Sequence, residues 1–282
     1  MKKISDFRPK KWLGQHFLND PGLVEKIISL ARLDATDIVL EIGPGLGALT
    51  LPLARSVAQV IAVEKDADLV DLLKEKLARE AIVNVDAVNQ DILAFDLDKV
   101  ASLCNERYKV LGNLPYNISS PLLEKLIENR TILSRAVLMF QQEVANRLCA
   151  SPGGKAYGAL TVLVRYHATP AILFKAPREV FYPKPKVDSM LLELDFERPY
   201  SRRADDEKLF KKVVKAAFSH RRKTLINSLS IFHPSWDRKI LTDAMDMCGI
   251  DPKRRAETLD MDEFLYLASA LSLTKNKVDD KH

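Results

Sequence analysis

Short apolar runs alternate with amphipathic segments through the first half of the chain. The runs that we expect to form buried strands are Ile38–Leu40, Val60–Val63, Val83–Val88 and Tyr108–Gly112. Between them the apolar residues recur at helical spacing, as in Ala67–Leu77. An earlier helix should begin at Asn19 or Asp20 with Pro21 and run to about Ala31. Strands that alternate with helices predict an α/β fold built on a parallel sheet.

The pattern changes in the second half. Tyr157–His167 has the composition of a buried helix, and Thr169–Phe174 and Ser189–Phe196 should form two late strands. Pro199–Asp206 is polar, and from Glu207 onward the spacing of apolar residues is helical only. We therefore predict a flexible basic arm (residues 1–18), an α/β domain (19–198) and a smaller all-α domain (199–282).

A glycine-rich turn follows the first predicted strand. Gly43, Gly45 and Gly47 occupy alternate positions, so the backbone can turn tightly and a ligand can approach without meeting a Cβ atom. A dinucleotide-binding turn normally has the spacing G-x-G-x-x-G, and Pro44 removes one N–H from any phosphate cradle. The turn therefore favours a ligand without a pyrophosphate, such as S-adenosylmethionine (AdoMet).

Acidic residues follow the next two predicted strands. Glu64 lies where it can accept hydrogen bonds from the ribose hydroxyls of an adenosine, although it could instead cap the helix that follows. Asp91 could accept the amino group of the adenine ring, or serve only as a turn residue. Both fall at the carboxyl ends of strands, the edge at which open α/β sheets bind ligands.

The fourth strand runs into Asn113-Leu114-Pro115-Tyr116, which suits methylation of an exocyclic amino group. Such a nitrogen is a poor nucleophile, because its lone pair is delocalised into the ring. The side-chain carbonyl of Asn113 and the backbone carbonyl of Leu114, held by Pro115, can each accept a hydrogen bond from one of its two N–H groups. Tyr116 offers a flat face to a base drawn out of its stack.

Several segments together resemble the ribosomal RNA adenine N6-dimethyltransferase family, in its small-subunit (16S) branch. They are Leu13–Leu18, Glu41–Gly47, Asn113–Asn117, Phe181–Ser189, Phe218–Leu225 and Arg254–Leu259. The match runs from near residue 10 to near residue 270. It implies a Rossmann-like AdoMet-dependent methyltransferase sheet and a helical C-terminal domain. The cofactor contacts that it implies are His16, Leu18, Gly43, Glu64, Asp91 and Asn113, beside Gly45 from the glycine turn.

The resemblance also implies a substrate. Members of this branch place two methyl groups on each of two adjacent adenosines in a hairpin near the 3′ end of the small-subunit RNA. An immature 30S subunit is then the expected partner, with a role in ribosome biogenesis. His16 departs from the family pattern, because many relatives carry Asn there. We keep it as a predicted cofactor contact; the alternative is a loop imidazole that faces solvent.

Phe181 is a further catalytic candidate. Pro183 and Pro185 stiffen the segment after it, which would fix Phe181 near the catalytic edge. We interpret Phe181 and Tyr116 as two faces that hold a flipped adenine between them. The alternative is that Phe181 packs in the core under the proline segment.

The charge distribution fits a polyphosphate partner. The net charge is only +5, yet basic residues cluster in the N-terminal arm and in two C-terminal groups. We predict RNA contacts at Arg221, Arg222, Lys223, Arg254 and Arg255. The alternative for each cluster is a solvated face, which is the commoner meaning of a charge run.

Composition excludes other classes of protein. The 3 cysteines are odd in number and form no C-x-x-C motif, and the 5 histidines show no ligand spacing, so we expect neither disulfides nor a metal site. We find no signal peptide or membrane span and expect a cytoplasmic monomer. Other functions remain open: a large-subunit RNA dimethyltransferase, an RNA-binding assembly factor for which methylation is secondary, or a mitochondrial transcription factor.

Overall fold

The computed structural model describes residues 8–104, 106–220, 222–232 and 236–279. These described residues divide into two compact units, one made of residues 8–145 with Thr169–Glu197 and the other of Asn146–Ala168 with residues 198–279. Among the described residues, no helix is long and apolar enough to cross a membrane.

The first unit is built on a seven-stranded sheet with the strand order β4-β3-β2-β5-β6-β9-β7. Its strands are β2 (Ile38–Ile42), β3 (Gln59–Glu64), β4 (Val85–Asn89), β5 (Tyr108–Asn113), β6 (Leu133–Gln141), β7 (Thr169–Ala176) and β9 (Ser189–Asp195). The strands from β4 to β6 are parallel, whereas β9 is antiparallel to both β6 and β7. The predicted parallel sheet is therefore confirmed, with an antiparallel edge made by the two late strands.

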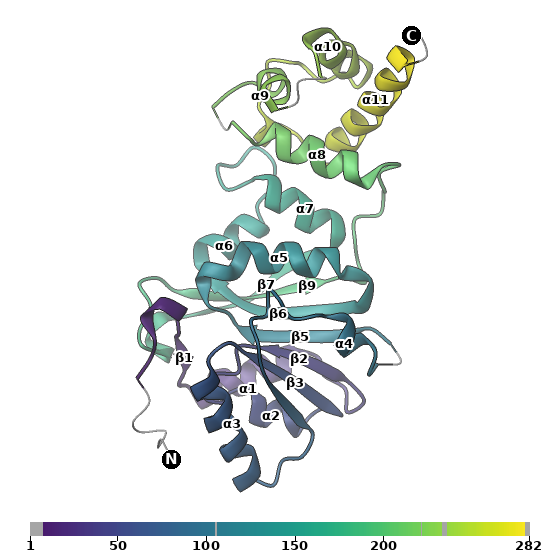
Figure 1. Cartoon of the computed structure of the whole chain (residues 1–282). Coiled ribbons are helices and arrows are strands. Elements are labelled where there is room, and N and C mark those ends of the chain that lie inside the picture. Colours follow the sequence, from purple (N-terminus) through teal and green to yellow (C-terminus); the bar gives the residue numbers. More distant parts are fainter. Residues whose placement is uncertain (1–7, 105, 221, 233–235, 280–282) are drawn as a thin grey trace. The chain divides into compact units, whose positions relative to one another are not determined.

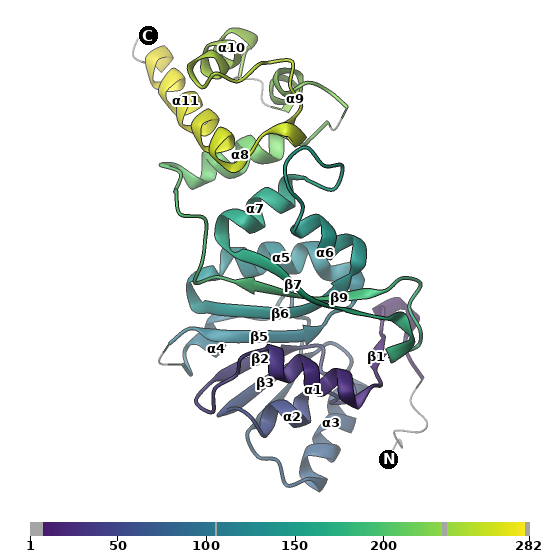
Figure 2. The same ribbon diagram turned by 180° about the vertical axis from the view of Figure 1, so that it is seen from behind.

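Helices cover both faces of this sheet. They are α1 (Pro21–Leu30), α2 (Thr50–Ala54), α3 (Ala67–Arg79), α4 (Asp98–Ala101), α5 (Ser119–Glu128) and the start of α6 (Gln142–Leu148). α1 lies on one face (Figure 2), and α5 lies on the opposite face (Figure 1). The carboxylate of Asp20 caps α1 by accepting from the Leu23 N–H at 2.8 Å, as the Asp-Pro start predicts.

Successive side chains of the buried strands point to opposite faces of the sheet, so each strand contributes to the packing on both faces. Val39, Val60, Ala62 and Leu111 share one apolar cluster with residues of α1, α2 and α3, while their neighbours in sequence lie on the other face. Because these strands are buried on both faces, they appear in the sequence as continuous apolar runs rather than as alternating ones.

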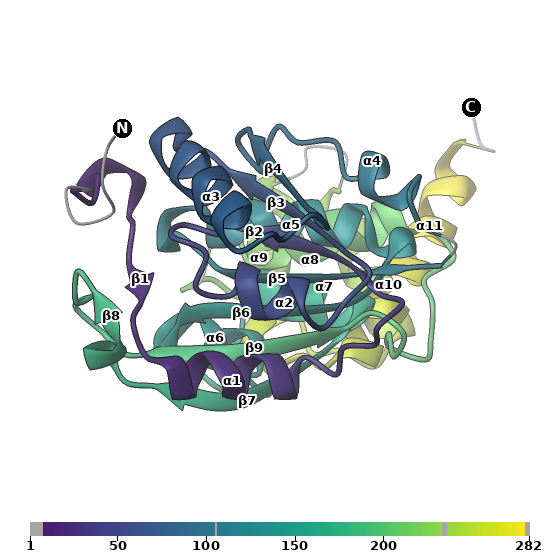
Figure 3. The same ribbon diagram turned by 90° about the horizontal axis from the view of Figure 1, so that it is seen from below.

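A second, two-stranded sheet joins the N-terminal segment to the proline-rich segment. Its strands are β1 (Phe17–Leu18) and β8 (Phe181–Tyr182), which lie beside each other (Figure 3). They run antiparallel, with Phe17 opposite Tyr182 and Leu18 opposite Phe181. Short 3₁₀ turns η2 (Lys11–Leu13), η3 (Tyr116–Ile118), η4 (Arg130–Ile132) and η5 (Arg178–Val180) complete the unit. This pairing joins segments more than 160 residues apart in the sequence.

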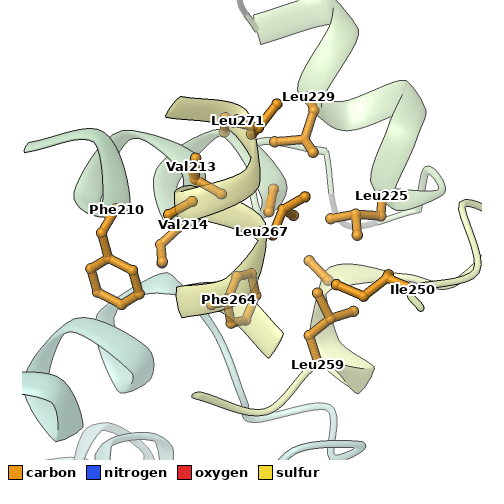
Figure 4. Close-up of a cluster of buried hydrophobic side chains, with 14 of the residues drawn as sticks. Phe210, Val213, Val214, Leu225, Leu229, Ile250, Leu259, Phe264, Leu267 and Leu271 are labelled. Atoms are coloured by element: carbon orange, nitrogen blue, oxygen red, sulfur yellow. The ribbon is translucent and has the colours of Figure 1, made fainter. Parts of the chain in front are cut away.

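The second unit is helical. It contains α7 (Ala159–His167), α8 (Glu207–Ala217), α9 (Leu225–Phe232), α10 (Arg238–Met247), the turn η6 (Ala256–Thr258) and α11 (Met261–Asp279). Phe210, Val214, Phe264 and Leu267 are among the side chains that meet in its core (Figure 4). The observed fold class is therefore the predicted one, an α/β sheet domain with a smaller helical region.

One segment groups differently from the predicted domains. Residues 146–168 belong to the helical unit, whereas the sequence placed them in the α/β domain. The reason is the apolar face of α7, because Val162, Leu163 and Tyr166 pack in the same cluster as Phe210. The ring of Tyr166 lies 4.5 Å from that of Phe210, measured between centroids.

Candidate active site

The functional residues predicted from the sequence gather at the carboxyl edge of the sheet. Ile42, at the end of β2, is in register with Val63 of β3 on one side and Gly112 of β5 on the other, so these strands end together. A cavity of about 300 Å³ opens at this edge, a volume in the range of small-molecule sites. It is lined by the turns after β2, β3, β4 and β5 and by residues 12–19 of the N-terminal segment.

The glycine turn lines this cavity with Gly43, Pro44, Gly45 and Leu46. Gly45 and Gly47 have φ angles of +56° and +78°, in the left-handed region that disfavours other residues. A Cβ atom on Gly45 would stand 3.0 Å from the ring of Phe17, and one on Gly47 would stand 2.8 Å from a methyl group of Leu73. The turn therefore requires glycine both for its conformation and for the close approach of its neighbours.

Glu64 is held by two backbone groups at the end of β3. Its carboxylate oxygens accept from the N–H of Asp66 at 2.9 Å and from that of Gly45 at 3.2 Å. Burial raises the pKa of Glu64, and these backbone hydrogen bonds oppose the rise. Both bonds fix the orientation of a carboxylate that lines the cavity, which suits recognition of paired hydroxyl groups.

Asp91 also lines the cavity, beyond the end of β4. It accepts from the Leu93 N–H at 2.9 Å, so it does act as a turn residue, and from the ammonium of Lys65 at 2.7 Å. The hydrogen bond from Lys65 is the main cause that lowers the pKa of Asp91. An ionised acceptor is therefore present where the adenine amino group was expected, and that contact stays a prediction.

Glu41 is a site residue to which the sequence analysis gave no role. It is 1% exposed, and its Oε2 atom has no hydrogen-bond partner among the described residues. Burial raises its pKa to about 8, and the nearby charge of Glu64 adds to the rise. The side chain lines the cavity. An acidic residue inside the apolar run before the glycine turn was the signal that could have identified it.

These features fit AdoMet. The glycine turn admits a ligand closely, Glu64 presents an oriented acceptor, and the buried carboxylate of Glu41 needs a cationic or donor partner. The methionine part of AdoMet supplies an ammonium and a sulfonium. We therefore expect Glu41 and the glycine turn to hold that part, and Glu64 and Asp91 to hold the adenosine.

The raised pKa of Glu41 predicts pH-dependent cofactor binding. Because its pKa is about 8, Glu41 is mostly protonated at pH 6, and a cationic ligand favours the ionised form. Binding should release a proton, so the affinity for AdoMet should rise by up to about tenfold per pH unit below pH 8. Titration calorimetry at pH 6, 7 and 8.5 on wild type and Glu41→Gln measures this. Titration of the cofactor's own amino group is common to both proteins, and equal pH slopes would contradict the assignment.

Asn113 is oriented by the N-terminal segment. Its side-chain N–H₂ donates to the backbone carbonyl of His16 at 2.6 Å. Only the nitrogen end can bond a carbonyl oxygen, so the Oδ1 atom of this cavity-lining residue is left as an acceptor. Among the described residues, Oδ1 has no donor. This is the orientation that acceptance from an amino group requires.

Tyr116 is half-buried at the start of η3. Its hydroxyl shares a hydrogen bond of 2.6 Å with Ser189 Oγ at the start of β9. Burial raises the pKa of Tyr116, which the bond to Ser189 opposes. The His16 ring stacks nearby, with 5.6 Å between centroids and 28° between planes, and its Nδ1 lies 2.5 Å from the Pro183 carbonyl. His16 thus links the N-terminal segment to both Tyr116 and the proline-rich segment.

The structure corrects the position assumed for Phe181. This side chain is 3% exposed and packs in the apolar cluster that also holds Leu18, its partner across the β1–β8 pair. Neighbouring residues of a strand point to opposite faces, so Tyr182 is the residue that faces outward and lines the cavity. The alternative considered above, that Phe181 packs in the core, describes the structure. This burial argues against the Phe181–Tyr116 sandwich, which requires the Phe181 ring to reach the cavity.

The predicted RNA contacts differ in how they are engaged. Arg221 lies outside the described residues. Arg222, Lys223 and Arg255 are exposed, whereas Arg254 forms a two-pronged ion pair with Glu263 and donates to the Thr258 carbonyl at 2.7 Å. The Leu225 N–H donates to the Arg254 carbonyl at 2.7 Å, which brings the two basic segments together.

Known structures share this architecture. A dimethyladenosine transferase from Plasmodium falciparum superposes with a TM-score of 0.76 at 28% identity, covering 92% of this chain and 98% of that one. The 23S rRNA methyltransferase ErmE superposes with a TM-score of 0.68 at 27% identity, covering 91% of this chain and 99% of that one.

Sequence comparison identifies the family. The family model described as ribosomal RNA adenine dimethylase matches residues 6–272. A ribosomal RNA small subunit methyltransferase A from Desulforapulum autotrophicum is 47% identical over 271 residues, 95% of this chain and 94% of the relative. One from Enterococcus faecalis is 40% identical over 280 residues, 98% of this chain and 94% of the relative. The resemblance found in the sequence is thus confirmed, and the chain belongs to the ribosomal RNA adenine dimethylase family, whose methyl donor is AdoMet.

Proposed function

We propose that this protein dimethylates N6 of two adjacent adenosines in the 3′-terminal hairpin of small-subunit (16S) ribosomal RNA. The observation that carries the proposal is the fixed amide of Asn113, a cavity-lining residue whose Nδ2 donates to the His16 carbonyl and leaves Oδ1 as the acceptor. Relatives at 40% and 47% identity, named as small-subunit methyltransferases, support this choice of substrate.

The chemistry follows from the carbonyl oxygens at the end of β5. AdoMet supplies a methyl group activated on a sulfonium. The Asn113 side-chain carbonyl and the Leu114 backbone carbonyl accept the two N–H groups of the adenine, which localises the lone pair on N6. The proton released after transfer goes to water, so a strong base is not required. Most of the rate then comes from orientation and from these fixed dipoles.

Pro115 keeps this loop in place. Its φ and ψ angles are −58° and 125°, and its carbonyl accepts from the Ile118 N–H at 3.2 Å. Leu114 is buried, so its backbone cannot shift without disturbing the core. A second transfer to the same nitrogen requires that N6-methyladenosine bind again with one remaining N–H. Asn113 or Leu114 alone can accept it.

The RNA contacts that we propose on the helical unit are Arg222, Lys223 and Arg255, which are exposed and lie on adjoining segments. We propose a structural role for Arg254 instead, because its guanidinium already donates hydrogen bonds to Glu263 and Thr258. A cytoplasmic monomer acting on an immature 30S subunit completes the proposal.

Paired substitutions separate these two roles. Arg254→Met should destabilise the helical unit by about 1 kcal/mol, because Glu263 loses a partly exposed ion pair. Arg255→Met should change stability by less than about 0.5 kcal/mol but weaken RNA binding and lower its salt dependence. Urea unfolding and RNA titrations at several salt concentrations measure both. The assignment is wrong if Arg255→Met leaves the salt dependence unchanged.

The test of the function itself uses methyl-labelled AdoMet, purified protein and small subunits from cells that lack this modification. Mass spectrometry of the labelled RNA should show dimethyladenosine at two adjacent positions near the 3′ end. Label on large-subunit RNA alone would instead support the activity named for ErmE, which has a similar fold. Tight binding to subunits without any label would support the assembly-factor alternative.

A further inference from the structure

Two large aromatic side chains at the cavity are exposed. Trp12 in η2 is 74% exposed and Tyr182 in β8 is 63% exposed, and both line the cavity at the carboxyl edge of the sheet. Both line the cavity that we assign to AdoMet, but no contact described above uses either ring. Aromatic rings of this size normally bury much of their surface, so two exposed ones at one opening indicate a ligand-binding role.

The backbone that carries Trp12 is anchored by residues that precede and follow it in the sequence. The Lys10 ammonium bonds the carboxylates of Asp66 and Asp68 at 2.6 and 2.9 Å. The Gln15 side chain donates to Asp66 at 2.8 Å and accepts from the Lys10 N–H at 2.8 Å. These contacts fix the turn while the indole stays exposed. A ring on a fixed backbone loses little entropy when a partner stacks on it.

Tyr182 is fixed in a similar way. Its neighbour Phe181 is buried in the core, and the carbonyl of the next residue, Pro183, lies 2.5 Å from the Nδ1 atom of His16. Across the β1–β8 pair it faces Phe17, whose ring lies over the glycine turn at Gly45. Residues directly opposite in an antiparallel pair point to the same side, so the Tyr182 ring stands on the cavity side.

The charge around these rings suits a nucleic acid strand. Arg8, Lys184 and Lys186 are exposed beside them in the sequence, and Lys184 pairs with Glu179 at 2.5 Å. The segment Lys175–Asp188 holds four basic and two acidic residues, so it is basic overall. Basic surfaces with exposed aromatic rings bind unpaired nucleotides by stacking, without reading their sequence.

We propose that Trp12 and Tyr182 form a stacking platform for unpaired nucleotides next to the adenosine that enters the cavity. The proposal rests on the proposed function, since a flipped adenosine in a hairpin loop has unpaired neighbours. These two side chains hold the RNA strand, while Asn113 and Leu114 contact the reacting base.

Fluorescence of Trp12 tests the stacking directly. The chain has 2 tryptophans, and the other, Trp236, is buried in the helical unit, so a Trp236→Phe protein reports on Trp12 alone. A hairpin with the small-subunit 3′-terminal loop should quench the emission and shield it from acrylamide. The demethylated cofactor product, S-adenosylhomocysteine, should neither quench nor shield it when added alone. Bound hairpin that leaves acrylamide quenching unchanged would overturn the proposal, as would full shielding by the cofactor product alone.

Kinetics give a second readout that keeps Trp236 in place. Trp12→Ala and Tyr182→Ala should each raise KM for RNA about tenfold, because stacking is lost, and should change kcat and AdoMet affinity far less. Trp12→Phe should restore most of the binding. Leu103→Ala, an exposed apolar residue that does not line the cavity, is the matched control. Unchanged KM in both alanine variants would overturn the platform.

The outcomes also separate the two proposals. If wild type labels no ribosomal RNA but the unpaired loop still shields Trp12, the proposed function fails and the platform stands. If labelling proceeds normally in both alanine variants at low RNA concentration, the platform fails and the function stands. If wild type labels no ribosomal RNA and also binds no hairpin, both fail.

Discussion

Asn113→Ala should lower the rate of methyl transfer by about 10²–10³-fold, the usual cost of removing one fixed group that stabilises a transition state. The variant loses the Oδ1 acceptor for the adenine amino group. It also loses the bond of 2.6 Å that holds the His16 carbonyl. Single-turnover rates at saturating AdoMet and RNA measure the loss separately from binding. The dissociation constant for AdoMet should change by less than about tenfold, because one neutral hydrogen bond contributes about 1 kcal/mol.

Asn113→Asp distinguishes the two roles of this side chain. The carboxylate keeps an acceptor at the same place but cannot donate to the His16 carbonyl. If acceptance from the amino group dominates, the Asp variant should retain clearly more activity than the Ala variant. Equal losses in the two variants would show that Asn113 acts mainly by anchoring the N-terminal segment, and the proposed chemistry would be wrong. Asn84→Ala, which changes an amide bonded to backbone carbonyls away from the cavity, controls for general damage.

The strands that carry the site were predictable from the sequence because burial on both faces leaves a strong signal. Val39, Val60 and Val110 stand in continuous apolar runs, and each run ends at a polar or glycine residue at the same edge of the sheet. The third run was less well predicted. β4 begins at Val85 rather than at Val83, whose side chain is 95% exposed.

What the sequence could not supply was long-range pairing. Phe181 and Tyr182 are both aromatic, and only the register with Leu18 and Phe17 decides which of them is buried. Local pattern favoured Phe181 as the residue at the catalytic edge, whereas the structure buries it and exposes Tyr182. A two-residue strand is too short to show an alternation.

Ion pairs escaped the sequence analysis for a related reason. Arg254 and Arg255 look alike as members of a basic run, but Glu263 reaches only one of them. Glu41 likewise appears as one polar residue in an apolar run, and only the packing shows that its Oε2 atom has no hydrogen-bond partner among the described residues. Which charges are free is decided by tertiary neighbours, and composition alone does not contain them.

Glu64→Ala should weaken AdoMet binding by about 100-fold, since a charged acceptor contributes up to about 3 kcal/mol through its hydrogen bonds. The structural basis is the orientation of the carboxylate by the N–H groups of Gly45 and Asp66. Calorimetry measures the change, and Asp86→Ala is the control, because that carboxylate bonds Gln59 on the neighbouring strand and does not line the cavity. Binding to small subunits should survive, which separates cofactor loss from loss of docking.

Glu64→Gln adds a second test, because it should change the pH dependence of AdoMet binding as well as the affinity itself. The charge of Glu64 helps to raise the pKa of Glu41, so the neutral Gln should lower that pKa below its value of about 8. The pH range over which AdoMet affinity rises should then move to lower pH, whereas Asp86→Ala should leave it in place. If affinity falls in Glu64→Gln without this displacement, Glu41 does not titrate in the binding step. If AdoMet binds both Glu64 variants as tightly as wild type, the carboxyl end of β3 is not the adenosine site.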